Sequence, residues 1–453
     1  MRAEDVAVPD SDAWWLSYLM RKLAARAPRV TRLGKWMAGD PPLPFPDNMK
    51  PGFERLQDIA KVNLASLVVE ARLHRMQLLG ATTTVDDSAN GDDEVAGIFR
   101  DQNLRAKLYE VLRYALGESV GYAFLRQDGT ITVADGLHAI MARDAAGRPV
   151  AALNIWRDEI NNRDVAILAR PGYFRVATHQ GTTLLPKEST VWVFGPESWE
   201  FEEAIPSGTE GIPVYEFTPP GGKSLIEPHL PTLQRINHGI LQRMILIALQ
   251  AFRQRALKGM PDRDPETGDP IENLEDVFES APDALWTLPE GVDVWESGQA
   301  DLGPVLTANK DDVRYLAVSS KTPLFMISPD DANGSAEGAA TQREILIFDV
   351  ESIIAGMESE IKRLISDALA QRGDTERADL SGIRLMWANP RRSSITERAQ
   401  AAATAAGAGV PFRLVMEKFA ELDPDVVEEA ERLRSDDLFA QALSTPKADD
   451  GGQ

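Results

Sequence analysis

The segment Gly221-Gly222-Lys223-Ser224 is the part of the sequence closest to a phosphate-binding loop. The motif Gly-x-x-x-x-Gly-Lys-Ser/Thr needs its first glycine because the backbone has to wrap around the phosphate groups. Here the first position is Phe217, and Pro219 and Pro220 lie inside the loop. The sequence therefore does not predict nucleotide binding at this segment.

The histidines show no spacing typical of metal ligands. The chain has five histidines and no cysteine, so a zinc site is not predicted. His229 and His238 are better interpreted as core or interface residues on or beside one helix. The histidines lie at positions 74, 138, 179, 229 and 238.

Acidic residues cluster in one loop, where Asp330 and Asp331 come shortly before Asn333 and Glu337. The spacing of a calcium-binding loop is missing, and a solvated loop is the preferred interpretation. No Ser-His-Asp signature is present either. A metal-dependent nuclease is therefore an alternative that no motif supports, and we expect a protein that is not an enzyme and has no cofactor or metal.

Length and charge restrict the function classes further. The chain has 453 residues, a net charge of -22 and an isoelectric point near 4.7. It is long enough for about two to four domains. An anionic surface repels DNA phosphates, which argues against tight DNA binding but allows DNA to slide past. Without cysteines, a secretory signal or an apolar span, we expect a soluble intracellular protein with no membrane partner.

A long cationic helix is predicted from Thr232 to Lys258, about 40 Å in length. No acidic residue occurs between Glu227 and Asp262, whereas thirteen occur from Asp262 to Asp301. Taken alone, the segment is an ordinary amphipathic core helix. Its basic residues are Arg235, Arg243, Arg253, Arg255 and Lys258.

Other segments alternate between helical and strand patterns. Helices are predicted over Asn63–Leu79, Asp93–Leu116, Asp311–Ser319 and Ala336–Gln371, with Ser11 as the cap of an earlier one. The Asp128-Gly129 pair predicts a hairpin between residues 122–127 and 130–134. Further turns are expected at Gly147-Arg148, Asn161-Asn162 and Pro171-Gly172. Additional strands are expected at Ser189–Phe194, Leu285–Leu288 and Val292–Trp295.

Several motifs, taken in order, resemble portal proteins of tailed double-stranded DNA bacteriophages, in the branch common among phages of actinobacteria. The resemblance covers nearly the whole chain. It rests on Gly39-Asp40-Pro41-Pro42-Leu43-Pro44-Phe45, on residues 63–80 (NLASLVVEARLHRMQLLG), on Gly121-Tyr122-Ala123-Phe124, on Lys258-Gly259 after the long helix, and on Asn333-Gly334-Ser335-Ala336-Glu337 before the next one.

The resemblance implies an α+β chain with the phage portal fold: a mixed wing, a two-helix stem, a small α/β clip, a long kinked helix and a helical crown. It divides the chain into a wing (1–230), first stem helix (231–259), clip (260–308), second stem helix (309–322), tunnel loop (323–338), long wing helix with a connecting segment (339–393), and crown with a flexible tail (394–453).

By the same resemblance, about twelve subunits form a ring at one capsid vertex. Double-stranded DNA passes through it during packaging and ejection, and the expected partners are the terminase large subunit, a head-completion or adaptor protein and the major capsid protein. The expected location is the virion, with the host cytoplasm during assembly. An oligomeric helical scaffold or adaptor without a channel is the alternative.

The resemblance also assigns candidate site residues. Those of the tunnel loop, at the narrowest point of the channel, are Ser328, Asp330, Asp331, Asn333 and Ser335. Those of the stem are Arg243, Arg253, Arg255 and Lys258, which lie either at subunit contacts or facing DNA. In the clip, Trp286 and Trp295 are expected to anchor a partner, and packing within the clip is an equal alternative.

Overall fold

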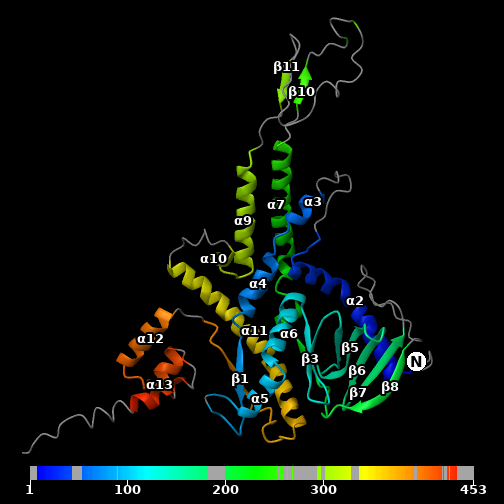
Figure 1. Ribbon diagram of the computed structural model, residues 1–453, viewed down its shortest axis with the longest axis vertical. Helices are drawn as coiled ribbons and strands as arrows, with labels where there is room; N and C mark the ends of the chain where they lie inside the picture. Colours follow the sequence, from blue (N-terminus) through cyan, green and yellow to red (C-terminus); the bar gives the residue numbers. More distant parts are fainter. Residues whose placement is uncertain are drawn as a thin grey trace, which may run out of the picture.

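We describe the protein from a computed structural model (Figure 1). The structure describes residues 8–42, 54–88, 90–180, 199–251, 255–258, 263, 268, 293–296, 301–327, 336–391, 395–420, 422, 426–427 and 429–435. Within these residues, helices and antiparallel sheets form separate layers, so the α+β class is confirmed.

The first helix, α2 (Asp12–Ala38), begins at the predicted cap. The Ser11 hydroxyl accepts a hydrogen bond from the Trp14 amide at 3.1 Å. The helix ends at Gly39, whose φ of 79° lets the chain reverse. Its buried face carries Leu16 and Leu23, which pack on a β-sheet.

The helix predicted over Asn63–Leu79 is wrong in its second half. Asn63 does cap a helix, α4 (Leu64–Leu73), which follows the short α3 (Glu54–Ile59). Residues Leu78–Thr82 instead form strand β1, which pairs antiparallel with β12 (Arg384–Trp387). Pairing with a strand near the far end of the chain overrides the local helical pattern.

The single helix predicted over Asp93–Leu116 is also wrong, because it is two helices, α5 (Asp93–Asp101) and α6 (Leu104–Glu118). Asn103 between them adopts a left-handed conformation, with a φ of 48°. The break reorients the chain so that α6 packs on both α4 and the neighbouring hairpin.

The predicted hairpin is confirmed as β2 (Gly121–Leu125) and β3 (Ile131–Asp135), with Gly129 at a φ of 77° in the turn. Strand β9 (Val214–Phe217) pairs with the other edge of β2 and completes a three-stranded sheet. A Cβ at residue 121 would lie 2.3 Å from the Val111 carbonyl oxygen. Glycine at this position therefore allows β2 to lie directly on α6.

A second sheet is a sequential antiparallel meander. It contains β4 (Ala139–Arg143), β5 (Pro149–Asp158), β6 (Arg163–Arg170), β7 (Tyr173–Gln180) and β8 (Glu200–Pro206). The predicted turns are confirmed, with positive φ at Gly147, Asn162 and Gly172. Helix α2 covers one face of this sheet, and the three-stranded sheet packs against the other.

Two 3₁₀ turns, η3 (Pro220–Gly222) and η4 (Glu227–His229), lead into α7 (Leu230–Ala251). The helix predicted to reach Lys258 is wrong at its end, since Arg255–Lys258 form strand β10 and pair with β11 (Asp293–Glu296). The predicted strand Val292–Trp295 thus corresponds to β11, which pairs with β10. A β-ladder here satisfies the backbone groups beyond the helix end.

The second stem helix begins earlier than predicted, as α9 (Gly303–Ser319). The Asp301 carboxylate accepts a hydrogen bond from the Gly303 amide at 2.8 Å, and Pro304 occupies the first turn. The helix start predicted at Asp311 is therefore wrong.

After the short α10 (Leu324–Ile327), helix α11 (Ala336–Gln371) has the bounds predicted from its periodicity. It is one continuous helix that passes below the ends of α9 and α7 and continues past α4 toward α5 (Figure 1). Its regular apolar positions, including Val350, Met357 and Leu364, are fully buried in the largest core.

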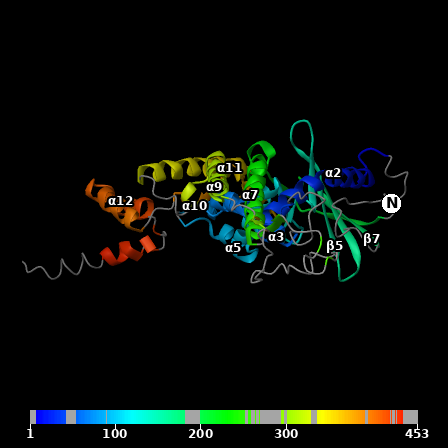
Figure 2. The same cartoon turned by 90° about the horizontal axis from the view of Figure 1, so that it is seen from above.

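The C-terminal helices stand beside this body, on the side of the stem away from the sheets (Figures 1 and 2). They comprise α12 (Ile395–Gly407), α13 (Phe412–Leu414), the π-helical η6 (Val415–Phe419) and a helical stretch at 429–435. Several predictions fall outside the described residues: the Pro-rich stretch after residue 42, the strands Ser189–Phe194 and Leu285–Leu288, and the C-terminal tail.

Candidate functional site

The antiparallel pair α7 and α9 projects from the body and carries β10 and β11 beyond its outer end (Figure 1). The helices approach closely at Gly239, where an added Cβ would lie 2.2 Å from the Asn309 Oδ1. The Arg235 guanidinium forms an ion pair with the Asp312 carboxylate at 2.8 Å. A glycine contact and an ion pair thus hold the two helices together.

The structure places the stem residues in different environments. Arg243 is half-buried on α7 and lines a cavity of about 300 Å³ together with Lys310 of α9 and Ile327 of α10. Lys258 is exposed on β10 and not on the helix. Arg255 also lies on β10, which corrects its helical assignment. Arg253 lies outside the described residues.

Of the two tryptophans expected in the clip, only Trp295 lies within the residues that the structure describes. Trp295 lies on β11, opposite Ala256 of β10. Trp286 lies outside the described residues, as do Ser328, Asp330, Asp331, Asn333 and Ser335 of the predicted tunnel loop. Within the described residues, Trp295 is the one candidate that lies beside predicted stem cations, because β11 pairs with the strand that carries Arg255 and Lys258.

Large apolar side chains are exposed on α9 and on the first half of α11. The exposed fraction is 66% for Tyr315 and 80% for Val318 on α9, and 65% for Phe348 on α11. Single exposed apolar residues are common, but these three lie on helices that the Lys321–Asp349 ion pair brings together. We call Tyr315, Val318 and Phe348 the exposed stem-base face.

The base of the stem is fixed by one buried arginine. Arg72 of α4 is 2% exposed, and its Nε donates to the Asp349 carboxylate of α11 at 2.7 Å. Its Nη1 donates to the Val68 carbonyl at 2.8 Å, and its Nη2 donates to the Ser320 carbonyl at the end of α9. Lys321 adds a second ion pair to Asp349 at 3.2 Å. Helices α4 and α11 and the end of α9 therefore meet at Arg72.

Further along, a hydrogen bond and ion pairs connect α11 to strands β4 and β9. Tyr215 of β9 donates to the Asp367 carboxylate at 2.6 Å, and Arg143 of β4 pairs with Glu216 at 3.0 Å and Glu360 at 3.6 Å. Burial raises the pKa of both Glu360 and Asp367. Such a network resists sliding of the long helix relative to the sheets.

The glycine-lysine segment is structural. Ser224 is 1% exposed, and its hydroxyl donates to the Gly117 carbonyl at 2.6 Å, which holds the segment on the end of α6.

His229 lies 3.3 Å from the Ser319 hydroxyl of α9, and burial lowers its pKa. Within the described ranges, no three His, Cys, Asp or Glu side chains are grouped as metal ligands would be. The same ranges contain no helix with the length and apolarity that a bilayer crossing requires.

Comparison with known proteins adds no identification: no family model and no curated protein matches the chain.

Sequence reasoning missed the residues at the base of the stem. Arg72 lies within an apolar helical pattern, where a single charge suggests a solvated position. Its partners Ser320 and Asp349 are far away in the sequence, so no local signal identifies the cluster. An arginine inside an otherwise apolar helix face was the one available indication.

Proposed function

We propose that this chain is a phage portal subunit, which forms a ring of about twelve copies around a channel for double-stranded DNA. The observation that carries the proposal is the projecting α7–α9 pair, which has a small β-unit at its outer end and a long helix at its base. This order of parts agrees with the order of motifs that resembles portal proteins.

The exposed apolar side chains support assembly with further copies. A chain whose stem-base helices leave Tyr315, Val318 and Phe348 open to solvent gains stability when a neighbour covers them. A ring places one stem beside the next, so each copy covers part of its neighbour. Arg243 and Lys310 lie near the junction of the two helices and fit subunit contacts better than an exposed belt facing DNA.

The negative charge of the chain supports a conduit more than a DNA-binding protein. With 48 basic and 70 acidic residues, the surface repels phosphates, which keeps passing DNA mobile. The proposed partners are the terminase large subunit during packaging, a head-completion protein at the β10–β11 end, and the major capsid protein around the wing. The proposed location is the capsid vertex.

The proposal is tested by native mass measurement and top-view electron microscopy of the purified full chain. A closed ring of about twelve copies, with a central hole wide enough for duplex DNA, is expected. A large assembly without a central hole would favour the scaffold or adaptor alternative instead. Metal-dependent cleavage of DNA by the pure chain would contradict a role without enzymatic activity.

A further inference from the structure

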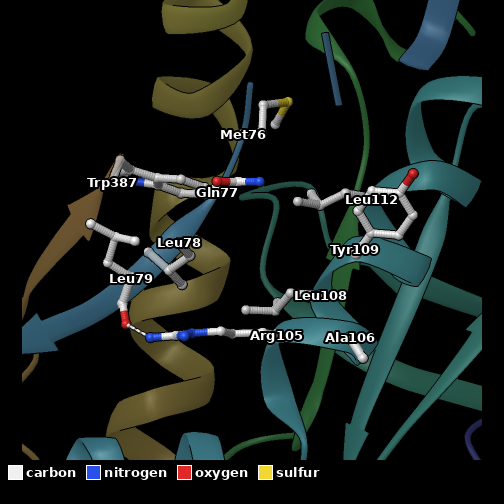
Figure 3. Close-up of a pocket in the computed structure, with 10 residues that line it drawn as sticks. All are labelled: Met76, Gln77, Leu78, Leu79, Arg105, Ala106, Leu108, Tyr109, Leu112 and Trp387. Atoms are coloured by element: carbon white, nitrogen blue, oxygen red, sulfur yellow. Dashed lines mark hydrogen bonds between the residues drawn. The ribbon is translucent and has the colours of Figure 1, made fainter. Parts of the chain in front are cut away.

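A surface groove runs between the β1–β12 strand pair and α6, with a volume of about 390 Å³ (Figure 3). Leu78, Leu79 and Trp387 form the strand side, and Tyr109 and Leu112 stand opposite on α6. Tryptophan, tyrosine, methionine and arginine, all present here, are the types enriched in protein interfaces. We call this site the β1–α6 groove.

The polar groups of the β1–α6 groove favour an acidic occupant. Arg105 is the only charged residue in its lining, and the ion pairs of the described chain include none to Arg105. One of its nitrogens donates to the Leu79 carbonyl at 2.6 Å, which fixes the guanidinium at the groove (Figure 3). The Trp387 Nε1 is shielded from water and has no hydrogen-bond acceptor within the described residues. The groove therefore presents apolar walls and one cation.

The C-terminal module, residues 395–435, has the complementary surface. Its own core consists of the small cluster Ala402, Ala405 and Val415. Outside that core, Val426 and Leu433 are 50% and 53% exposed, and their spacing puts them on one helical face. Glu429 lies between them on the same face; its side chain is 53% exposed and forms a surface ion pair with Arg432 at 2.7 Å, which Arg105 would have to replace or share. The module thus presents an apolar, acidic, apolar series.

Composition agrees with this match. From Ala420 to Glu431 the sequence has six acidic residues and no lysine or arginine, and Arg432 and Arg434 follow. Arg391, in the connection before the module, pairs with Glu344 of α11 at 2.5 Å, which holds the connection on the long helix. A closed ring requires two different complementary surfaces on every subunit. The β1–α6 groove and the C-terminal module provide such a pair.

We propose that the β1–α6 groove of one copy binds the C-terminal module of a neighbouring copy, with Val426 and Leu433 on the apolar walls and Glu429 at Arg105. This inference rests on the proposed ring and names one of its subunit contacts. It predicts a contact far from the stem, so that wing and crown of adjacent subunits are linked.

The absence of cysteine in the chain permits a direct test by disulfide trapping. Two full-length single variants, Leu79→Cys and Val426→Cys, are mixed and oxidised, so that a Leu79–Val426 disulfide joins different molecules. The expected product is a mixed dimer, and the double variant should give a ladder of higher species. Ile160→Cys, at a 95% exposed turn in the second sheet, replaces Leu79→Cys in the control mixture.

Charge reversal tests the recognition itself. Arg105→Glu should lower the yield of mixed dimer about tenfold, and adding Glu429→Arg on the other chain should restore it. Folding of each variant is checked by circular dichroism. A yield no greater than that of the Ile160→Cys control would overturn the proposal. A disulfide formed only within single chains of the double variant would show binding to the same copy and would also overturn it.

The test of the groove contact can fail or succeed independently of the test of the portal proposal. A closed ring in electron micrographs without the Leu79–Val426 cross-link would leave the portal proposal standing and remove this contact. A cross-linked but open assembly would keep the contact and remove the ring.

Discussion

The Arg72 guanidinium and the Asp349 carboxylate form a 2.7 Å ion pair although they are 277 positions apart in the sequence. The pair joins α4 to α11, and the other donors of Arg72 reach the end of α9. One side chain thereby fixes the stem on the wing. In the proposed ring, displacement of the stem by passing DNA is resisted at this point.

Removing Arg72 is expected to be strongly destabilising. Arg72→Ala leaves the Asp349 carboxylate and the Ser320 carbonyl without their main donor, at a cost of about 3 kcal/mol in the free energy of unfolding. Urea unfolding followed by tryptophan fluorescence measures the change. The matched control is Arg100→Ala, because Arg100 is 78% exposed and its ion pair with Asp101 is long, at 4.0 Å. We expect this substitution to change the free energy of unfolding by less than about 0.5 kcal/mol. Equal effects of the two substitutions would contradict the role of Arg72.

Glu118 is expected to make stability depend on pH. Burial, followed by the nearby Asp135 charge, raises its pKa from the ordinary 4.5 to about 7, with Arg113 and His138 acting in the opposite direction. The folded state therefore binds this proton more tightly than the unfolded state. The stabilisation is complete below pH 4.5 and is lost as pH rises through about 7.

Glu118→Gln should remove that contribution. Between pH 5.5 and pH 8.5, the free energy of unfolding of the natural chain should fall by on the order of 1 kcal/mol relative to that of the variant. Denaturant unfolding at both pH values measures the difference. His138 remains in the variant, where the hydrogen bond and charge of Asp135 still raise its pKa but the contribution of the Glu118 charge is lost. A difference between the two chains that does not vary with pH would refute the assignment to Glu118.

Gly239 is expected to set the spacing of the stem helices. Gly239→Val places side-chain atoms where Asn309 now lies, 2.2 Å from the position of the new Cβ, and should destabilise the chain by about 1–3 kcal/mol. Adding Asn309→Ala should recover part of the loss, because it removes the clashing atoms. The measurement is a double-mutant cycle in denaturant unfolding.

A second helical glycine provides the control for Gly239. A Cβ at Gly356 of α11 would meet only the Pro220 Cγ at 3.8 Å, an ordinary contact. Gly356→Ala should therefore stabilise the chain by about 0.5–1 kcal/mol through helix propensity. If Gly239→Val were equally harmless, close packing at Gly239 would not be the reason for glycine there.

The exposed stem-base face is expected to be needed for assembly and not for folding. Phe348→Asp and Val318→Asp should change monomer stability by no more than about 0.5 kcal/mol, since both side chains are largely in solvent. They should nevertheless shift native mass from ring to monomer. Ile160→Asp serves as the control and should leave the ring intact. Rings formed by all three variants would place the subunit interface elsewhere.

Sequence patterns identified those elements whose signals are local. The Ser11 cap, the Asp128-Gly129 hairpin and the long helix predicted over Ala336–Gln371 depend on neighbouring residues, and the structure confirms all three. Leu78 was assigned to a helix because its strand partner, Trp387, comes from a distant segment. The break at Asn103 was missed because asparagine carries only a weak turn preference inside an apolar helical pattern.

The candidate site was less predictable than the fold. Its geometry depends on Arg72, Ser320 and Asp349, which converge only in the folded chain. The Arg255–Lys258 segment has no acidic residue and a helical pattern before it, so the strand pairing with Asp293–Glu296 could not be inferred locally.

The pairing of β1 with β12 has a consequence for synthesis on the ribosome. Residues 78–82 leave the ribosome early, but their partner strand at 384–387 is made only after most of the chain. At about 5–20 residues per second, β1 waits on the order of tens of seconds for its partner. Since Trp387 also forms one wall of the β1–α6 groove, a nascent chain lacks the complete groove until residue 387 has left the ribosome. In the proposed assembly, association through the groove has to wait until that point of synthesis.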